Sequence, residues 1–299
     1  MNRKIIKQGS STLTISLPSS WTRKLGLSAG DEVDVNISDN VLLVAAEQQS
    51  KKREITIDLA DVPAGIMKTY IYYIYINGYD EVTLKNVETK VCDDISNYIN
   101  SMIGYEIIDE TKGIIKIRDF SGDKEESFDQ ILRRIFLLII AFAEDGTAML
   151  KSKKVSSFKE FARRDHTVNK FVAYCLRTLN KKGHKDYKRT TIYYTVIHML
   201  EALSDEFARL FFQLGSPIQN GTIKHYEETV NMCRKMYGVF YNFDKKEIQD
   251  LILWRNEFRN KIATYMSKRH VNDNKVLYRL SKVAEFAVDV LRLRISLEI

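Results

Sequence analysis

The chain has 299 residues and a formal net charge of +7, and its length predicts two or three domains. The most apolar run, IFLLIIAFA at 135–143, is far shorter than a membrane-spanning helix, so we expect no membrane insertion. The N-terminus lacks a signal-peptide pattern, and the three cysteines stand far apart in no metal-binding spacing. Free thiols of this kind are typical of a reducing compartment, so we expect a cytoplasmic protein.

The first 47 residues predict a small β domain in the order β-β-helix-β-β. The runs KIIK and TLTISL are separated by QGSS, a typical hairpin turn. Pro18 and Gly26 are placed to begin and end the short helix SSWTRKLG, with Ser16 as the expected N-cap. Two further runs, VDVNI and VLLVA, flank the turn SDN. A unit below about 50 residues without a disulfide or metal buries little apolar surface, so we expect it to dimerise.

Charge is sorted along this domain. The first thirty residues hold five Lys or Arg and no acid, whereas the next seventeen hold five acids and no Lys or Arg. Because acids would repel phosphates, the sorting favours nucleic-acid binding over an ordinary solvated face. Trp21 is expected to close the small hydrophobic interior instead of stacking on a base. The overall charge belongs to residues 121–299, which carry 32 basic and 22 acidic groups.

The segments LTISLP, WTRKLGL and GDEVDV resemble the AbrB/MazE swapped-hairpin family over residues 1–47. The resemblance implies that two chains interleave their hairpins into one DNA-binding domain whose all-basic part faces the DNA. The acids then lie on the second hairpin, on the far side. The expected phosphate contacts are Arg3, Lys4, Lys7, Ser10, Ser11, Thr12, Arg23 and Lys24.

Residues 52–120 predict a small α+β domain, which we expect to connect its neighbours. REITIDL and YDEVTL are predicted strands, and YEIIDET and GIIKIRD predict a hairpin. The first helix is expected to be capped by Asp61 with Pro63 in its first turn, and the second helix is expected over ETKVCDDISNYINSM. The order is therefore β-α-β-α-β-β, and it contains no catalytic constellation.

Residues 124–299 predict an all-α domain. The apolar periodicity predicts helices near 125–150, 155–181, 187–214, 221–241, 245–268 and 273–298. An internal repeat with an offset of 80 pairs Leu200 with Leu280, Leu203 with Val283, and Asp205 with Glu285. We therefore expect a pair of three-helix bundles in tandem.

The acids of this repeat resemble those of the PhoU family, regulators of phosphate uptake built from two three-helix bundles. The resemblance implies metal clusters held by acid-x-x-x-acid pairs on helices two and three of each repeat. Here only Glu201 and Asp205 keep the pattern, and Asp165 is followed by Asn169. The second repeat holds Asn256, Asn260, Ser281 and Glu285. We expect no metal in repeat two and at most one weakly held cation in repeat one, at Asp165, Glu201 and Asp205. The alternative is a solvated face paired with nearby Lys or Arg.

The chain contains no GxxxxGK[ST], GxGxxG or HExxH motif, so we expect no enzymatic activity. An AbrB-like domain joined to a PhoU-like domain resembles archaeal-type phosphate-uptake regulators. This combination predicts a homodimeric, DNA-binding transcriptional regulator whose helical part senses a signal or binds a partner. One alternative is a signalling adaptor that docks on a phosphate transporter or other protein and uses the first domain mainly to dimerise. Another is an antitoxin-like repressor, which a long packed helical part disfavours.

Overall fold

The structure is a computed structural model that describes residues 2–38, 40–46, 52–60, 62–121, 128–266 and 270–299. Its internal contacts divide the chain into two compact units, Met1–Lys52 and Arg53–Ile299. We call the first unit the head and the second unit the body, and we describe each by itself.

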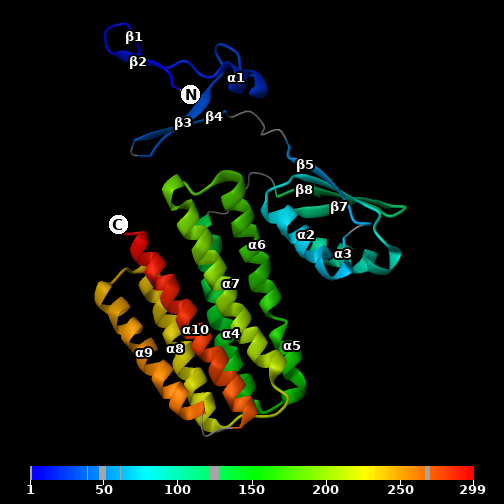
Figure 1. Cartoon of the computed structure of the whole chain (residues 1–299), viewed down its shortest axis with the longest axis vertical. Helices are drawn as coiled ribbons and strands as arrows, with labels where there is room; N and C mark the ends of the chain where they lie inside the picture. Colours follow the sequence, from blue (N-terminus) through cyan, green and yellow to red (C-terminus); the bar gives the residue numbers. More distant parts are fainter. Residues whose placement is uncertain (1, 39, 47–51, 61, 122–127, 267–269) are drawn as a thin grey trace. The chain divides into compact units, whose positions relative to one another are not determined.

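The head contains two antiparallel hairpins with a short helix between them (Figure 1). Its elements are β1 (Ile6–Gln8), β2 (Thr12–Thr14), α1 (Ser19–Leu25), β3 (Val33–Ser38) and β4 (Val41–Ala46). Gly26 ends α1 in the left-handed conformation, with φ at 69°, as the sequence predicts. The predicted order β-β-helix-β-β is confirmed.

The predicted helix cap at Ser16 is wrong. Pro18 is the N-cap of α1, and no side chain accepts a hydrogen bond there. The Pro18 carbonyl instead accepts hydrogen bonds from the amides of Trp21 and Thr22, at 2.9 and 3.0 Å. Ser16 stands two residues before the cap position, from which its hydroxyl does not serve the free amides of the first turn.

The described residues of the head form no hydrophobic core of their own. None of its residues with a described exposure is buried, and Trp21 is only half-buried. Leu13 is 67% exposed and Ile37 is 80% exposed. The other large apolar side chains exposed in the head are Ile5, Ile6, Ile15, Leu17, Val35, Val41 and Leu42. Folding of the head therefore requires further apolar contacts beyond those made within one copy.

The first part of the body is an α+β layer, a four-stranded sheet with two helices (Figure 1). Its elements are β5 (Glu54–Asp58), α2 (Ala64–Ile76), β6 (Glu81–Lys85), α3 (Thr89–Asn100), β7 (Tyr105–Thr111) and β8 (Ile114–Asp119). The strand order is β5-β6-β8-β7, with β5 and β6 parallel and the other pairs antiparallel. The predicted order β-α-β-α-β-β is confirmed. Pro63 directly precedes α2, and the predicted cap Asp61 lies outside the described residues.

Period-2 alternation in β6 and β8 explains why this sheet forms. Val82 pairs with Ile117, and Leu84 pairs with Ile115, so four buried side chains share one face. Their neighbours along each strand are more exposed. The buried face supplies the core of the α+β layer.

The rest of the body is a helical bundle (Figure 1). Its helices are α4 (Phe128–Ser152), α5 (Phe158–Ala162), α6 (Asp165–Lys182), α7 (Thr190–Gln213), α8 (Asn220–Tyr241), α9 (Lys245–Met266) and α10 (Val271–Ser296). Helices α4, α6 and α7 pack together, and so do α8, α9 and α10; α7 packs on α10, and α4 packs on α8. The predicted pair of three-helix units is thereby confirmed. No helix in the described part of the chain is long and apolar enough to cross a membrane.

The internal repeat is visible in the packing of α7 against α10. Leu200 and Leu203 on α7, and the matching Leu280 and Val283 on α10, are all fully buried. Matched positions of the two repeats therefore fill the same kind of core site.

The predicted helix 155–181 is wrong in its continuity, because α5 and α6 are separate helices. The chain turns at Arg163 and Arg164, whose carbonyls accept hydrogen bonds from residues three positions on. This turn accompanies the packing of Phe158 and Phe161 against Phe211, with ring centroids 5.7 and 4.7 Å apart. The predicted helix ends near 125 and 268 lie outside the described residues.

The extent of the body can be compared with the predicted domain boundaries. Residues 53–299 form one compact unit, which includes both the α+β layer and the helical bundle. The predicted division of this unit into a domain at 52–120 and a domain at 124–299 stays a prediction.

We predict that Gly146→Ala destabilises the body by about 1–3 kcal/mol through overpacking. A Cβ at Gly146 in α4 would overlap the hydroxyl of Tyr226 on α8, which donates a hydrogen bond to the Ala143 carbonyl at 2.9 Å. The matched control is Gly238→Ala in α8, where a Cβ meets no atom within 4 Å and helix propensity improves. Thermal denaturation should show a lower midpoint for the first variant only, and equal midpoints would contradict the close approach.

Candidate functional site

The eight predicted phosphate contacts lie on the first hairpin and α1 of the head. All eight are exposed: Arg3, Lys4, Lys7, Ser10, Ser11, Thr12, Arg23 and Lys24. None of their side chains makes a hydrogen bond or ion pair with another residue that the structure describes. Five positive charges that have no counterion among the described residues are therefore available to an external anion.

These basic residues occupy two neighbouring segments of the head. Lys7 pairs with Leu13 across β1 and β2, so they share one face of the hairpin. Arg23 and Lys24 stand in the last turn of α1, where positive charge complements the helix dipole. The first acid, Asp31, accepts a hydrogen bond from the Ser28 amide at 2.7 Å in the turn before β3.

The acids of repeat one lie on α6 and α7. Two of them, Asp165 and Asp205, form hydrogen bonds or ion pairs with neighbouring side chains. Buried Asp165 accepts hydrogen bonds from Ser204 and from Asn169, the latter at 3.0 Å. Asp205 forms an ion pair with Arg209 on the next helical turn. Burial raises the pKa of Asp165, and burial together with the Asp165 charge raises the pKa of Asp205 to about 6.

Glu201 lies beside the α+β layer. Its carboxylate is 3.3 Å from Nδ1 of His198. Burial, followed by the charge of Glu201, raises the pKa values of Tyr72 on α2 and Tyr98 on α3. The Tyr72 hydroxyl is buried without a hydrogen-bond partner. Among the acids of repeat one, Glu201 is therefore the one whose charge acts on the tyrosines of the α+β layer.

The metal site that the sequence predicts in repeat one would take its acids from Asp165 on α6 and from Glu201 and Asp205 on α7. No group of three or more His, Cys, Asp or Glu among the described residues is placed to hold one ion. The Asn169 Oδ1 atom is buried without a partner, but it adds only one neutral oxygen to Asp165 and Asp205. Hard cations prefer about six oxygen ligands. A cation at Asp165, Glu201 and Asp205 stays a prediction.

Repeat two holds an arginine clamp where acids would be needed. Arg255 and Arg259 both form ion pairs with Glu285, and Arg255 also donates to Asn256 Oδ1 at 3.1 Å. Burial alone would raise the pKa of Glu285, but hydrogen bonds from Arg259 and Arg255 hold it below its usual value. Ser281 donates to the Tyr278 carbonyl at 2.7 Å. Two guanidinium groups thus compensate the one acid that repeat two retains.

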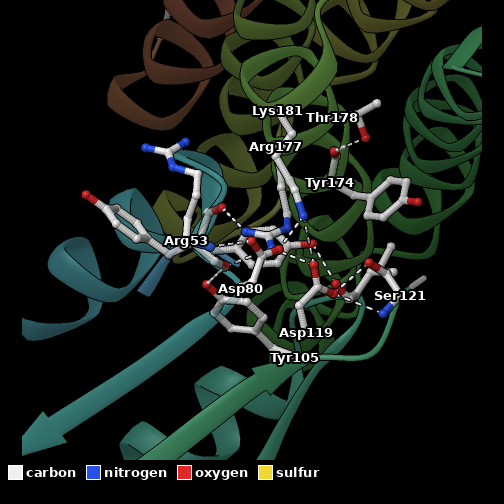
Figure 2. A network of polar contacts seen from close by, with 12 residues as sticks. Arg53, Asp80, Tyr105, Asp119, Ser121, Tyr174, Arg177, Thr178 and Lys181 are labelled. Atoms are coloured by element: carbon white, nitrogen blue, oxygen red, sulfur yellow. Dashed lines mark hydrogen bonds and ion pairs between the residues drawn. The ribbon is translucent and has the colours of Figure 1, made fainter. Parts of the chain in front are cut away.

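The sequence did not single out Arg177, which joins the helical bundle to the α+β layer (Figure 2). Its side chain, only 3% exposed, donates to the carbonyls of Tyr75 and Tyr79 at 2.6 and 2.8 Å and to Asp119 at 2.5 Å. The guanidinium also lies over the rings of Tyr75 and Tyr105, at 4.9 and 5.0 Å from their centroids. A buried charge with this many partners fixes the two parts of the body together.

Several hydrogen-bond donors converge on the C-terminal end of α2. Besides Arg177, Asn180 on α6 donates to the Ile76 carbonyl at 2.8 Å, and Arg53 donates to the Asn77 carbonyl at 2.5 Å. Lys181 reaches Asp80 at 2.5 Å and Asp119 at 3.4 Å (Figure 2). Arg177, Asn180 and Arg53 thus satisfy carbonyls at the C-terminal end of α2, and the positive charges complement the negative end of its dipole.

A signal for Arg177 exists in the sequence. It stands in AYCLRTLN, where the flanking helix positions Ala173, Leu176 and Leu179 are apolar and buried. An arginine inside such a stripe requires buried acceptors. The partners come from residues 58 to 102 positions earlier in the chain, which no local pattern identifies.

Comparisons with known proteins give one match for the head and a separate match for the helical bundle. Residues 6–53 match the family described as antidote-toxin recognition MazE, bacterial antitoxin, which confirms the predicted resemblance of the head. A comparison with curated protein sequences returns no match. A structural neighbour of the helical part is the phosphate transport system regulatory protein PhoU from Streptococcus pneumoniae. It is 12% identical with a TM-score of 0.48, over 57% of this chain and 93% of that chain.

We predict that Arg177→Ala destabilises the body by about 3 kcal/mol, because it leaves the buried Asp119 carboxylate without its main partner. Burial alone would raise the pKa of Asp119, but hydrogen bonds from Ser121 and from Arg177 lower it. This contribution to stability is therefore present above about pH 4 and is lost as pH falls through the folded pKa.

The control for Arg177→Ala is Arg292→Ala, which removes an exposed ion pair with Asp289 on the same helix and should cost less than about 1 kcal/mol. Urea denaturation at pH 7 followed by circular dichroism measures both variants. Equal denaturation midpoints for the two variants would show that Arg177 does not join the layer to the bundle.

Proposed function

We propose that this protein is a DNA-binding transcriptional regulator whose head contacts the DNA. The observation that carries the proposal is the set of five exposed Lys and Arg side chains in the first thirty residues, with no acid among them. Each lacks a counterion in the described part of the chain. Phosphate neutralisation by such groups supplies most of non-specific DNA affinity.

The proposed DNA-binding form is a homodimer. The exposed apolar side chains of both hairpins, including Leu13 and Ile37, would be buried if two heads interleave. A twofold dimer would also present the basic set twice, which suits the two half-sites of a palindromic operator. The proposed dimer would therefore explain both the exposed apolar side chains and the unpaired basic residues of the head.

We propose phosphate uptake as the regulated process and the helical bundle as its sensor or partner-binding part. This assignment rests on the sequence resemblance of the repeat and on the two three-helix units. The proposal includes no enzymatic activity. The signalling adaptor is the second candidate. The exposed apolar side chains of the head favour dimerisation whether or not the head binds DNA. The antitoxin role in the name of the matched family fits less well, since the body is a folded unit that spans residues 53–299.

We predict that Arg3→Ala, Lys7→Ala and Arg23→Ala together weaken binding to all DNA sequences. The slope of log affinity against log salt should fall by roughly one for each phosphate that is no longer neutralised. The matched control replaces Lys159, Lys170 and Lys224, three exposed lysines of the bundle. Fluorescence anisotropy with a labelled duplex measures both. If only the control loses affinity, the bundle is the DNA-binding surface, and if the wild type shows none, the adaptor is favoured.

We predict that the full chain is a dimer of 34.8 kDa subunits held through the head. Leu13→Asp with Ile37→Asp places charges on two exposed apolar positions and should shift the chain to monomers, because a buried unpaired carboxylate is costly. Leu253→Asp, at an exposed position of α9, is the control. Sedimentation velocity at micromolar concentration reports the state. A monomeric wild type would contradict the interleaved head.

A further inference from the structure

A cavity of about 410 Å³ lies between α8 and α9, and none of its lining residues takes part in the Arg177 contacts. Each helix lines it with four side chains at positions i, i+3, i+4 and i+7, beginning at Glu228 on α8 and at Glu247 on α9. Two helix faces therefore converge on one space. Its volume falls in the range of about 300–1,000 Å³ that is typical of small-molecule sites.

The floor of this cavity is apolar and aromatic. Met232 on α8 and Leu251 on α9 are buried beneath it, and half-buried Trp254 also lines it. The Phe258 ring stacks on the indole of Trp254 with centroids 4.5 Å apart and planes 17° apart. The stacking restrains the indole, so Trp254 offers a rigid aromatic surface to a ligand.

The rim of the cavity carries acids that lack partners. The exposed carboxylates of Glu247 and Asp250 make no hydrogen bond or ion pair with any described residue, and Lys235 is the basic group of the lining. Glu228 is different, because His225 Nδ1 and Lys261 Nζ stand 3.6 and 3.7 Å from its Oε2 atom. The rim thus has two uncompensated negative charges against one lysine.

Acids on the neighbouring surface of the bundle show the contrast. Glu144 pairs with Arg234 at 2.5 Å, and Glu227 pairs with Lys151 at 2.5 Å. Pairing is therefore available to some surface carboxylates of the bundle, whereas Glu247, Asp250 and also Glu257 on α9 have no partner among the described residues.

We propose that this cavity binds a small organic cation, an alkyl ammonium or guanidinium compound. The cationic group lies between the Glu247 and Asp250 carboxylates, and its apolar stem packs on Met232, Leu251 and the Trp254 ring. An anion would be repelled by the rim. A neutral apolar ligand would cover two carboxylates without compensating their lost hydration. The site is independent of DNA binding by the head.

Isothermal titration of the full chain without DNA tests the proposal, with spermidine and agmatine as the probes and 1,4-butanediol as an uncharged analogue. Glu247→Gln with Asp250→Asn should weaken binding of both cations at least tenfold. Trp254→Leu should also weaken it. Glu257→Gln, an exposed acid on the same helix outside the cavity, is the matched control and should leave affinity unchanged.

The proposal is overturned if neither cation binds, if butanediol binds as tightly, or if the Glu257 and Glu247/Asp250 variants behave alike. Trp254→Leu could unfold α9 by removing the contact with Phe258, whereas the two acids are exposed. The acid variant therefore decides the question on its own, with circular dichroism to show that its helix content is unchanged.

Discussion

The body depends on one buried charge, the guanidinium of Arg177. Taking this group out of water is costly, and the cost is offset only if all its donors are satisfied. The sheet layer supplies what it needs: the carbonyls of Tyr75 and Tyr79 and the carboxylate of Asp119. Since these acceptors have fixed directions, they determine where the layer lies on α6. In the same arrangement α2 packs on α6, and the charge of Glu201 on α7 contributes to the raised pKa values of Tyr72 and Tyr98.

The body and the head differ in how far their charged side chains are paired within the chain. In the body, Glu285 forms ion pairs with two arginines and Asp205 forms one, so two of the four acids at the family-like positions are neutralised by arginine. In the head, the basic residues of the first hairpin and α1 have no such partners among the described residues, and no described side chain is buried. The described head thus lacks both buried apolar contacts and partners for its basic side chains. In the proposed complex, a second chain would supply the apolar contacts and DNA phosphates would supply the negative charge.

Much of the fold follows from local patterns in the sequence. Alternation in β6 and β8, and apolar matches such as Leu200 with Leu280, predicted the layers and the repeat because these signals lie within each element. The break between α5 and α6 was missed because it depends on Phe158 packing against Phe211, about fifty residues later. The exposure of the five basic residues of the head was also predictable, since all of them lie in one thirty-residue stretch without an acid. The contacts of Arg177 were not, because distant segments supply them.

Hydrogen–deuterium exchange of the full chain, with and without a mixed-sequence duplex at low salt, tests the central claim that the head alone meets DNA. The account predicts slower exchange on DNA addition for the amides of β1, the following turn, β2 and α1. Exchange in the helical bundle should be unchanged, although residues 121–299 carry ten more basic than acidic groups. Slower exchange in the bundle, with the head unaffected, would contradict the account.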